Sequence, residues 1–170
     1  MGLESLKEPI LGTAREMILR EGDIPPTVFL VREQEVVGMA PLGTVPVPEQ
    51  LERHMKTRVG MYFLGGLLRL KPPPVSWDSV AFISTAWMVS PTPEEPVPRP
   101  PLSEHPRRTE VLVLTYSRGQ DDHDMEVIPF FRSPDGPVFE APLEKPDKVE
   151  SVVMDSFWKG YELKPPPVGF

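Results

Sequence analysis

Val80-Ala-Phe-Ile-Ser-Thr-Ala-Trp-Met-Val89 is the stretch of sequence that decides the fold. The run is rich in the β-branched and aromatic residues that strands favour, and it is apolar on both faces except for Ser84 and Thr85. We therefore expect this run to form the central strand of a sheet.

Further strands are indicated on both sides of this run. Downstream, the sequence predicts strands at 109–116 and 125–132 and a short strand at 137–141. Pro129 has no backbone N–H to give to a neighbouring strand, so it predicts an edge position or a bulge in the second of these. Upstream, residues 27–31 and 36–39 predict a β-hairpin.

Helices are predicted at both ends of the chain. A capping-box spacing at Ser5 and Glu8 indicates the start of the first helix, and Gly22 is a natural stop for it. Pro146 predicts the first residue of the last helix, with Asp155 on its outer side. The inward positions of that last helix are expected at Val149, Val153, Phe157 and Tyr161.

A middle helix is predicted from Pro48 or Glu49 onward. It becomes apolar on all sides over residues 61–68, a pattern typical of burial on more than one side or of a subunit contact. Its glycines, which include Gly65, each lower helix propensity by about 1 kcal/mol relative to alanine. Either the helix ends at Leu64 or the glycines allow close packing of two backbones.

These elements predict an α+β fold over residues 1–170 as a single domain. We expect a five-stranded, mostly antiparallel sheet with helices packed on it, in the order α-β-β-α-β-β-β-α, since no repeated β-α-β unit is present. A proline-rich loop at 91–106 and an extended tail at 163–170 complete the chain. The element order is similar to that of profilin-like and roadblock-type modules, and this resemblance implies a dimerising scaffold or a regulatory platform.

Charge and cysteine content exclude several classes of function. The net charge of −7 works against a nucleic-acid partner. The absence of cysteine excludes disulfides, thiolate nucleophiles and zinc–thiolate sites. No basic and apolar leader is present, and the longest apolar run, at 59–68, is about half of a membrane span, so we expect a cytoplasmic protein without a membrane partner.

The composition also bears on the working temperature. The chain has 24 prolines, only three glutamines and no asparagine, a pattern reported for thermophile proteins. Codon bias in a GC-rich genome is the alternative explanation for the same composition.

Asp121, Asp122, His123 and Asp124 form the densest group of potential metal ligands. Three carboxylates and an imidazole suit Mg²⁺, Ca²⁺ or Mn²⁺. Adjacent loop residues rarely converge on one ion, so the alternative is a solvated hairpin tip.

A second candidate site comprises His105, Arg107, Arg108 and Glu110, just before a predicted strand. An imidazole and two guanidiniums there suit a phosphate or carboxylate ligand. The alternative is a charged strand entry in which Glu110 pairs with an arginine.

The hexapeptide Leu-Lys-Pro-Pro-Pro-Val occurs twice, at 70–75 and 163–168. Each copy follows a predicted helix and is followed by a small residue and an aromatic, Trp77 or Phe170. The repetition indicates either two equivalent docking segments or simply two helix terminators, because triple proline cannot continue a helix.

No nucleotide-binding, zinc-protease or serine-hydrolase motif is present, and no cofactor is expected. The leading hypothesis is a non-enzymatic interaction, regulatory or scaffold module that forms a homodimer or binds a protein partner. The alternatives are a small hydrolase or ligand-binding enzyme that brings the two candidate sites into one cleft, and an accessory protein of a phage or mobile element. Residues expected at an interface are Tyr62, Phe63, Leu67, Trp77 and Trp87.

Overall fold

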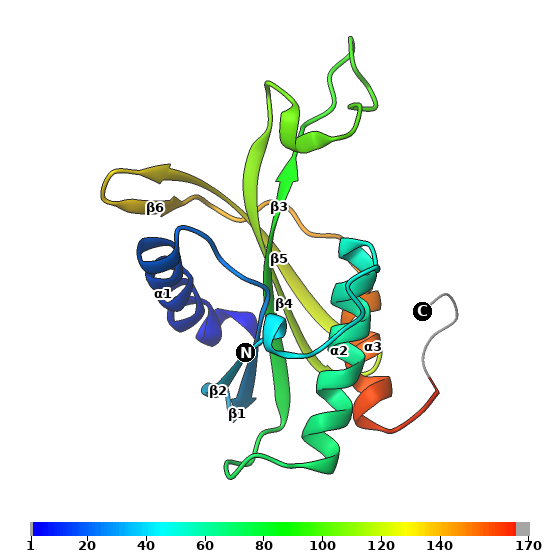
Figure 1. The fold of residues 1–170 in the computed structure, drawn as a ribbon. Helices are drawn as coiled ribbons and strands as arrows, with labels where there is room; N and C mark the ends of the chain where they lie inside the picture. The colour runs from blue at the N-terminus through cyan, green and yellow to red at the C-terminus, as the bar shows by residue number, and fades with distance from the viewer. Residues whose placement is uncertain (1, 166–170) are drawn as a thin grey trace.

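The computed structural model describes residues 2–165 and contains one curled, antiparallel sheet (Figure 1). Its strand order is β2-β1-β3-β4-β5-β6, so the run that decides the fold lies inside the sheet, between β1 and β4. The strands are β1 (Thr27–Arg32), β2 (Glu35–Pro41), β3 (Ser79–Met88), β4 (Thr109–Gly119), β5 (Asp122–Ser133) and β6 (Gly136–Phe139).

The sheet has six strands, and the prediction of five is wrong by one. The short strand predicted at 137–141 pairs with β5 in register Phe130 to Phe139 and joins the same sheet as β6. A two-residue turn closes this hairpin, and Gly136 takes a positive φ of 118° there, which a residue with a side chain rarely adopts. The turn and the extra strand therefore form together.

Pro129 lies in β5 directly before the residues that also pair with β6. Its carbonyl accepts a hydrogen bond from the Glu140 N–H, on the side facing away from β4. In an antiparallel strand the N–H and C=O of one residue point to the same side. The N–H that proline lacks would therefore also point away from β4, and its absence removes no hydrogen bond between β4 and β5. The edge position that the proline predicts is confirmed for the first half of β5 only.

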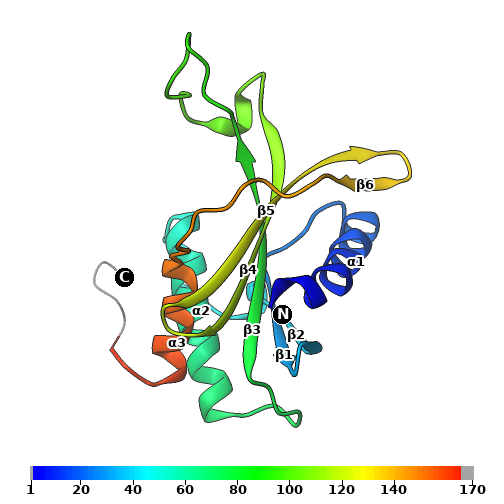
Figure 2. The same cartoon turned by 180° about the vertical axis from the view of Figure 1, so that it is seen from behind.

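Helices cover both faces of the sheet. Figures 1 and 2 show α1 (Leu3–Glu21) on one face and α2 (Arg53–Leu70) with α3 (Val152–Tyr161) side by side on the other. Each face has its own apolar core, because alternate side chains of β1, β3 and β4 point to opposite sides. The α1 core includes Leu6, Ile10, Phe29, Ile83, Leu114 and Phe130, and the second core includes Val28, Phe82, Met61, Leu64, Met154 and Phe157.

Two helix boundaries differ from those predicted. The middle helix begins at Arg53 and not at Pro48 or Glu49, and it continues past Leu64 to Leu70. The last helix begins after Ser151, whose hydroxyl accepts the Met154 N–H as an N-cap, and not at Pro146. The Ser151 cap marks the start of the last helix, whereas the middle helix begins after Glu52 without a side-chain cap.

The first helix begins two residues before the predicted capping box and ends where predicted. Ser5 bonds the Gln34 side chain instead of capping the helix. At the other end, Gly22 adopts a left-handed φ of 80° and its N–H reaches the Ile18 carbonyl.

Close packing of α2 against α3 explains two of the glycines. A Cβ atom on Gly65 would overlap the Phe157 carbonyl oxygen, and a Cβ on Gly160 would overlap the Tyr62 carbonyl oxygen. The two helix backbones therefore touch at these positions. The helices run parallel, since Thr57 and Val153 lie beside one cleft near their starts and Arg69 stacks on Tyr161 near their ends.

Candidate functional site

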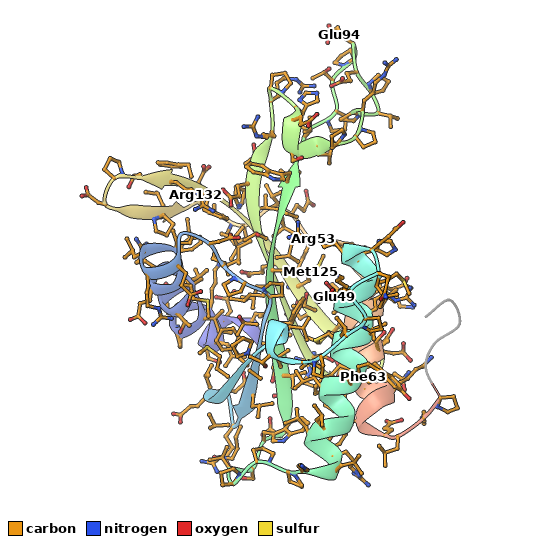
Figure 3. The ribbon with its side chains drawn as sticks, in the orientation of Figure 1. Glu49, Arg53, Phe63, Glu94, Met125 and Arg132 are labelled. Atoms are coloured by element: carbon orange, nitrogen blue, oxygen red, sulfur yellow. The ribbon has the colours of Figure 1, made fainter. Side chains whose placement is uncertain are left out.

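The proline-rich loop 91–106 is held by a charged cluster. The His105 Nε2 atom lies 2.5 Å from Glu95 Oε1, and Arg107 donates to the same carboxylate oxygen at 3.0 Å. Arg107 also donates to the Ser90 carbonyl. Figure 3 shows Glu94 at the far end of this loop, which projects beyond the helices. The cluster therefore ties Glu95, next to the far end of the loop, to the returning segment at 105–107.

The carboxylate of Glu95 makes this contact sensitive to acid. The hydrogen bond with His105 is the largest cause that holds the pKa of Glu95 below its ordinary value of 4.5, and Arg107 adds to it. Because the folded pKa is lowered, the contribution of the carboxylate is complete at neutral pH and is lost as the pH falls below 4.5 through the folded value.

We therefore expect the loop to loosen in acid before the sheet unfolds. The protection factors of residues 91–106 against amide hydrogen exchange should fall below the ordinary glutamate pKa in the wild type, whereas those of β3 and β4 should not. The Glu95→Gln variant should show the fast loop exchange already at neutral pH. Equal loop exchange in the wild type and in this variant at neutral pH would contradict the assignment.

The four residues of the predicted anion site are directed to separate partners. His105 and Arg107 bind Glu95, whereas Arg108 lies over the Trp87 ring at 5.2 Å. Glu110 forms a two-pronged pair with Arg132, with contacts of 2.8 and 3.1 Å that raise the pKa of Arg132. Glu110 does pair with an arginine, but with one from β5.

The four residues of the predicted metal site also diverge. Arg118 binds Asp122 and lowers the pKa of its carboxyl, and Lys145 binds Asp124 at 2.7 Å. Asp121 occupies the turn with a φ of 61°. His123 points inward instead. Within residues 2–165, no group of three His, Asp or Glu side chains is placed to hold a metal ion.

His123 belongs to a buried hydrogen-bond network that sequence reasoning missed. Its Nδ1 atom lies 2.8 Å from Ser117 Oγ, and its Nε2 atom lies 2.8 Å from Asp155 Oδ1. Trp158 donates its indole N–H to Ser117 Oγ at 2.7 Å, and Ser117 donates to the Gly119 carbonyl. The network ties the β4–β5 turn to α3. Asp155 was predicted to face outward, and only the folded turn brings His123 to it.

A serine, a histidine and an aspartate in series invite comparison with a hydrolase triad. However, Ser117 has no exposed surface, and its hydroxyl is already engaged by Trp158, His123 and Gly119. A nucleophile must reach its substrate, so this geometry is that of a structural clamp.

The two histidine clusters cannot share one cleft. His105 precedes the start of β4, and His123 follows its end. A strand of 11 residues spans about 33 Å at 3.3 Å per residue. The arrangement required by the hydrolase alternative is therefore not formed.

An apolar groove on the outer side of α2 is the remaining candidate site. Its volume is about 360 Å³. Phe63, Leu67 and Leu70 on α2 expose 43%, 45% and 68% of their surface, and Figure 3 shows Phe63 on the outer side of the helix. The complete lining is Val45, Pro46, Tyr62, Phe63, Gly66, Leu67, Leu70, Gly160 and Leu163.

Three of the five residues expected at an interface therefore line one groove, namely Tyr62, Phe63 and Leu67. Trp77 instead is partly buried and packs against the second core, with its ring 5.0 Å from that of Tyr161. Trp87 stacks with Arg108 and borders a different, more polar cleft of about 590 Å³ between β3 and the start of α2.

No helix within residues 2–165 has the length and apolar character needed to cross a membrane. Comparison of the chain with protein-family models, with curated protein sequences and with solved structures finds no match.

Proposed function

We propose that this chain is a non-enzymatic interaction module that associates with another protein chain through the groove of α2, and that a second copy of itself is the simplest such partner. The supporting observation is the stripe of Phe63, Leu67 and Leu70, three large apolar side chains left in contact with solvent on one side of one helix. Exposed apolar surface concentrated in a groove favours protein contact, because its removal from water contributes roughly 25 cal/mol per Å².

The shape of the groove supports a protein partner rather than a small polar ligand. Val45 and Pro46 from the segment before α2, Gly66 of α2, and Gly160 and Leu163 from the end of α3 contribute to its lining. Among the residues that the structure describes, no charged side chain lines the groove. A ligand held there would therefore be bound by shape and apolar contact, which is how an aliphatic or aromatic side chain of another chain is held.

The resemblance of the element order to profilin-like and roadblock-type modules favours the same class of function, since those modules mostly act as dimerising scaffolds or regulatory platforms. A cytoplasmic location and a thermophilic source agree with this proposal and stay predictions. An accessory role in a phage or mobile element is a special case that would appear as assembly beyond a dimer.

Light scattering coupled to size exclusion tests the proposal. The wild-type chain should show a mass that rises toward that of a dimer with concentration, and Leu67→Glu should stay a monomer because it places a charge in the apolar groove. Leu19→Glu is the matched control, since Leu19 is exposed on α1, on the opposite side of the sheet. A strict monomer at high micromolar concentration, or equal association of all three proteins, would contradict the homodimer.

A further inference from the structure

The ladder between β1 and β3 stops halfway along β3. Its last pair joins Thr27, the first residue of β1, to Ile83. On its other side, β3 continues to pair with β4 as far as Met88, which lies opposite Thr109. Residues 84–88 are therefore paired on one side only.

Residues 84–88 form an open edge inside the sheet. Among residues 2–165, no strand pairs with their outer side and no other backbone group bonds to it. Alternate residues of a strand direct their N–H and C=O groups to that side, so the edge offers a row of unpaired donors and acceptors. The row extends about 17 Å, since a strand rises roughly 3.3 Å per residue.

The two outer edges of the sheet carry features that discourage pairing with another chain. β2 has Glu35 at its start and Pro41 at its end, and a bulge interrupts its ladder with β1. β6 has only four residues and contains Pro137. Residues 84–88, Ser-Thr-Ala-Trp-Met, contain no charge and no proline. Natural sheets protect the edges that must stay unpaired, so this unprotected edge is suited to a further strand.

The open edge borders the polar cleft of about 590 Å³. Residues 84–87 line this cleft together with the start of α2 and the short helix η2 (Leu102–Glu104). Figure 3 shows Arg53 where α2 begins, on the side of β3. Because the edge, α2 and η2 surround one space, a strand added to β3 would contact all three.

The unpaired charge of the cleft is positive. Arg53 is exposed, and it makes no ion pair with any residue that the structure describes. His54 lies 3.5 Å from Glu52, which does not line the cleft. Glu110 does line it, but its carboxylate is already paired with Arg132. An acidic side chain is therefore the favoured neighbour of Arg53.

We propose that residues 84–88 of β3 bind an extended, acidic segment of a partner protein, which joins the sheet as an added strand. Backbone hydrogen bonds to the open edge hold the segment, and its alternate side chains face the start of α2. An aspartate or glutamate of the segment pairs with Arg53 there. This pairing selects acidic segments among those that can extend.

This surface goes beyond the proposed function, because it is distinct from the apolar groove. The cleft contacts α2 at Arg53, whereas the groove contacts it around Leu67. Fourteen residues of helix separate the two positions, or about 21 Å. One chain can therefore use both surfaces at once.

Selection from a displayed library of random heptapeptides tests the open edge. The bait is the full-length chain carrying Leu67→Glu, so that the apolar groove does not select the peptides. Enriched sequences should contain β-branched residues at alternate positions and Asp or Glu at one shared position. A selection that enriches nothing, or that enriches peptides without an acidic position, overturns the proposal.

The consensus peptide of that selection then locates the contact. In the isotope-labelled wild-type chain it should shift the amide signals of residues 84–88 and protect alternate amides there from exchange. Two N-methylated versions block opposite edges of the peptide, and one should lose binding while the other retains it. Equal binding of both versions, or shifts confined to residues 61–70, would show that no strand is added to β3.

Reversing the charge of Arg53 tests the acidic preference. Arg53→Glu should weaken binding of the consensus peptide about tenfold, because it removes the one ion pair and adds a repulsion. A glutamate suits the first turn of a helix, so the variant should fold normally. Lys71→Glu is the matched control, since it makes the same change on an exposed residue at the other end of α2. Equal losses in the two variants would contradict the role of Arg53.

A second copy of the chain is the alternative occupant of the edge. Protection of amides 84–88 that rises with protein concentration, without any peptide, would identify that occupant and overturn the proposal. The outcome is separate from that of the proposed function. The peptide should bind the wild-type chain and Leu67→Glu equally, whereas self-association that Leu67→Glu abolishes concerns the groove alone.

Discussion

Replacing Gly65 or Gly160 by alanine is expected to destabilise the protein by roughly 3 kcal/mol, close to the upper end of overpacking effects. The added Cβ would overlap a backbone carbonyl of the facing helix, Phe157 for Gly65 and Tyr62 for Gly160. A backbone atom cannot rotate away as a flexible side chain does, so α2 and α3 would have to separate. Denaturant unfolding of the two variants measures the loss.

Gly66→Ala is the matched control, because it changes the next residue of the same helix. A Cβ at Gly66 would lie 3.5 Å from the Gly160 carbonyl oxygen, which is ordinary van der Waals contact. Since alanine has the higher helix propensity by about 1 kcal/mol, this variant should be as stable as the wild type or more so. Similar stability of the Gly65 and Gly66 variants would contradict the close approach of the two helices.

Ser117→Ala is expected to cost roughly 2–4 kcal/mol although it removes one oxygen atom. The change leaves the Trp158 indole N–H and the Gly119 carbonyl without the partner that they share, and an unsatisfied buried polar group costs about 1–3 kcal/mol. The loss should appear in denaturant unfolding, together with a change in the fluorescence of Trp158.

Thr57→Ala provides the comparison for removal of a hydroxyl. The Thr57 hydroxyl donates to the Arg53 carbonyl on an exposed turn of α2. Water can replace the hydroxyl as the donor to that carbonyl. Its loss should change the free energy of unfolding little. A loss for Ser117→Ala no greater than that for Thr57→Ala would mean that the network does not clamp the β4–β5 turn to α3.

The sheet was largely predictable because its signals are local. The apolar run at 80–89 lies between two strands, and its first half, 80–83, is buried with a helix layer on each side, whereas Ala86 and Trp87 are exposed. The hairpin turn at Glu33 and Gln34, both with positive φ, and the stop at Gly22 depend on a few adjacent residues. Such local features therefore appear in the structure as predicted.

Features that depend on distant partners were not predictable. The sequence left open whether Gly65 ends a helix or packs against another, and only the position of Phe157 decides. His123 looked like a metal ligand because Asp155 and Ser117 are not recognisable as its partners from spacing alone. Neither Pro146 nor Pro48 starts a helix: the last helix begins after the Ser151 cap, and the middle helix begins at Arg53.

The sequence predicted the part of the candidate groove that α2 supplies, but not its other walls. The all-round apolar stretch at 61–68 indicated a buried or interfacial helix, and Phe63 and Leu67 do lie in the groove. The walls supplied by Val45 and Leu163 come from segments far along the chain, so the sequence contained no signal for them.

The molar mass of the wild-type chain and of its Leu67→Glu variant over a range of concentrations tests the central claim most directly. The wild-type chain should dimerise as its concentration rises, and Leu67→Glu should return it to a monomer. A wild-type chain that remains monomeric at high micromolar concentration, or a dimer that Leu67→Glu leaves intact, would contradict the assignment of α2 as the interaction surface.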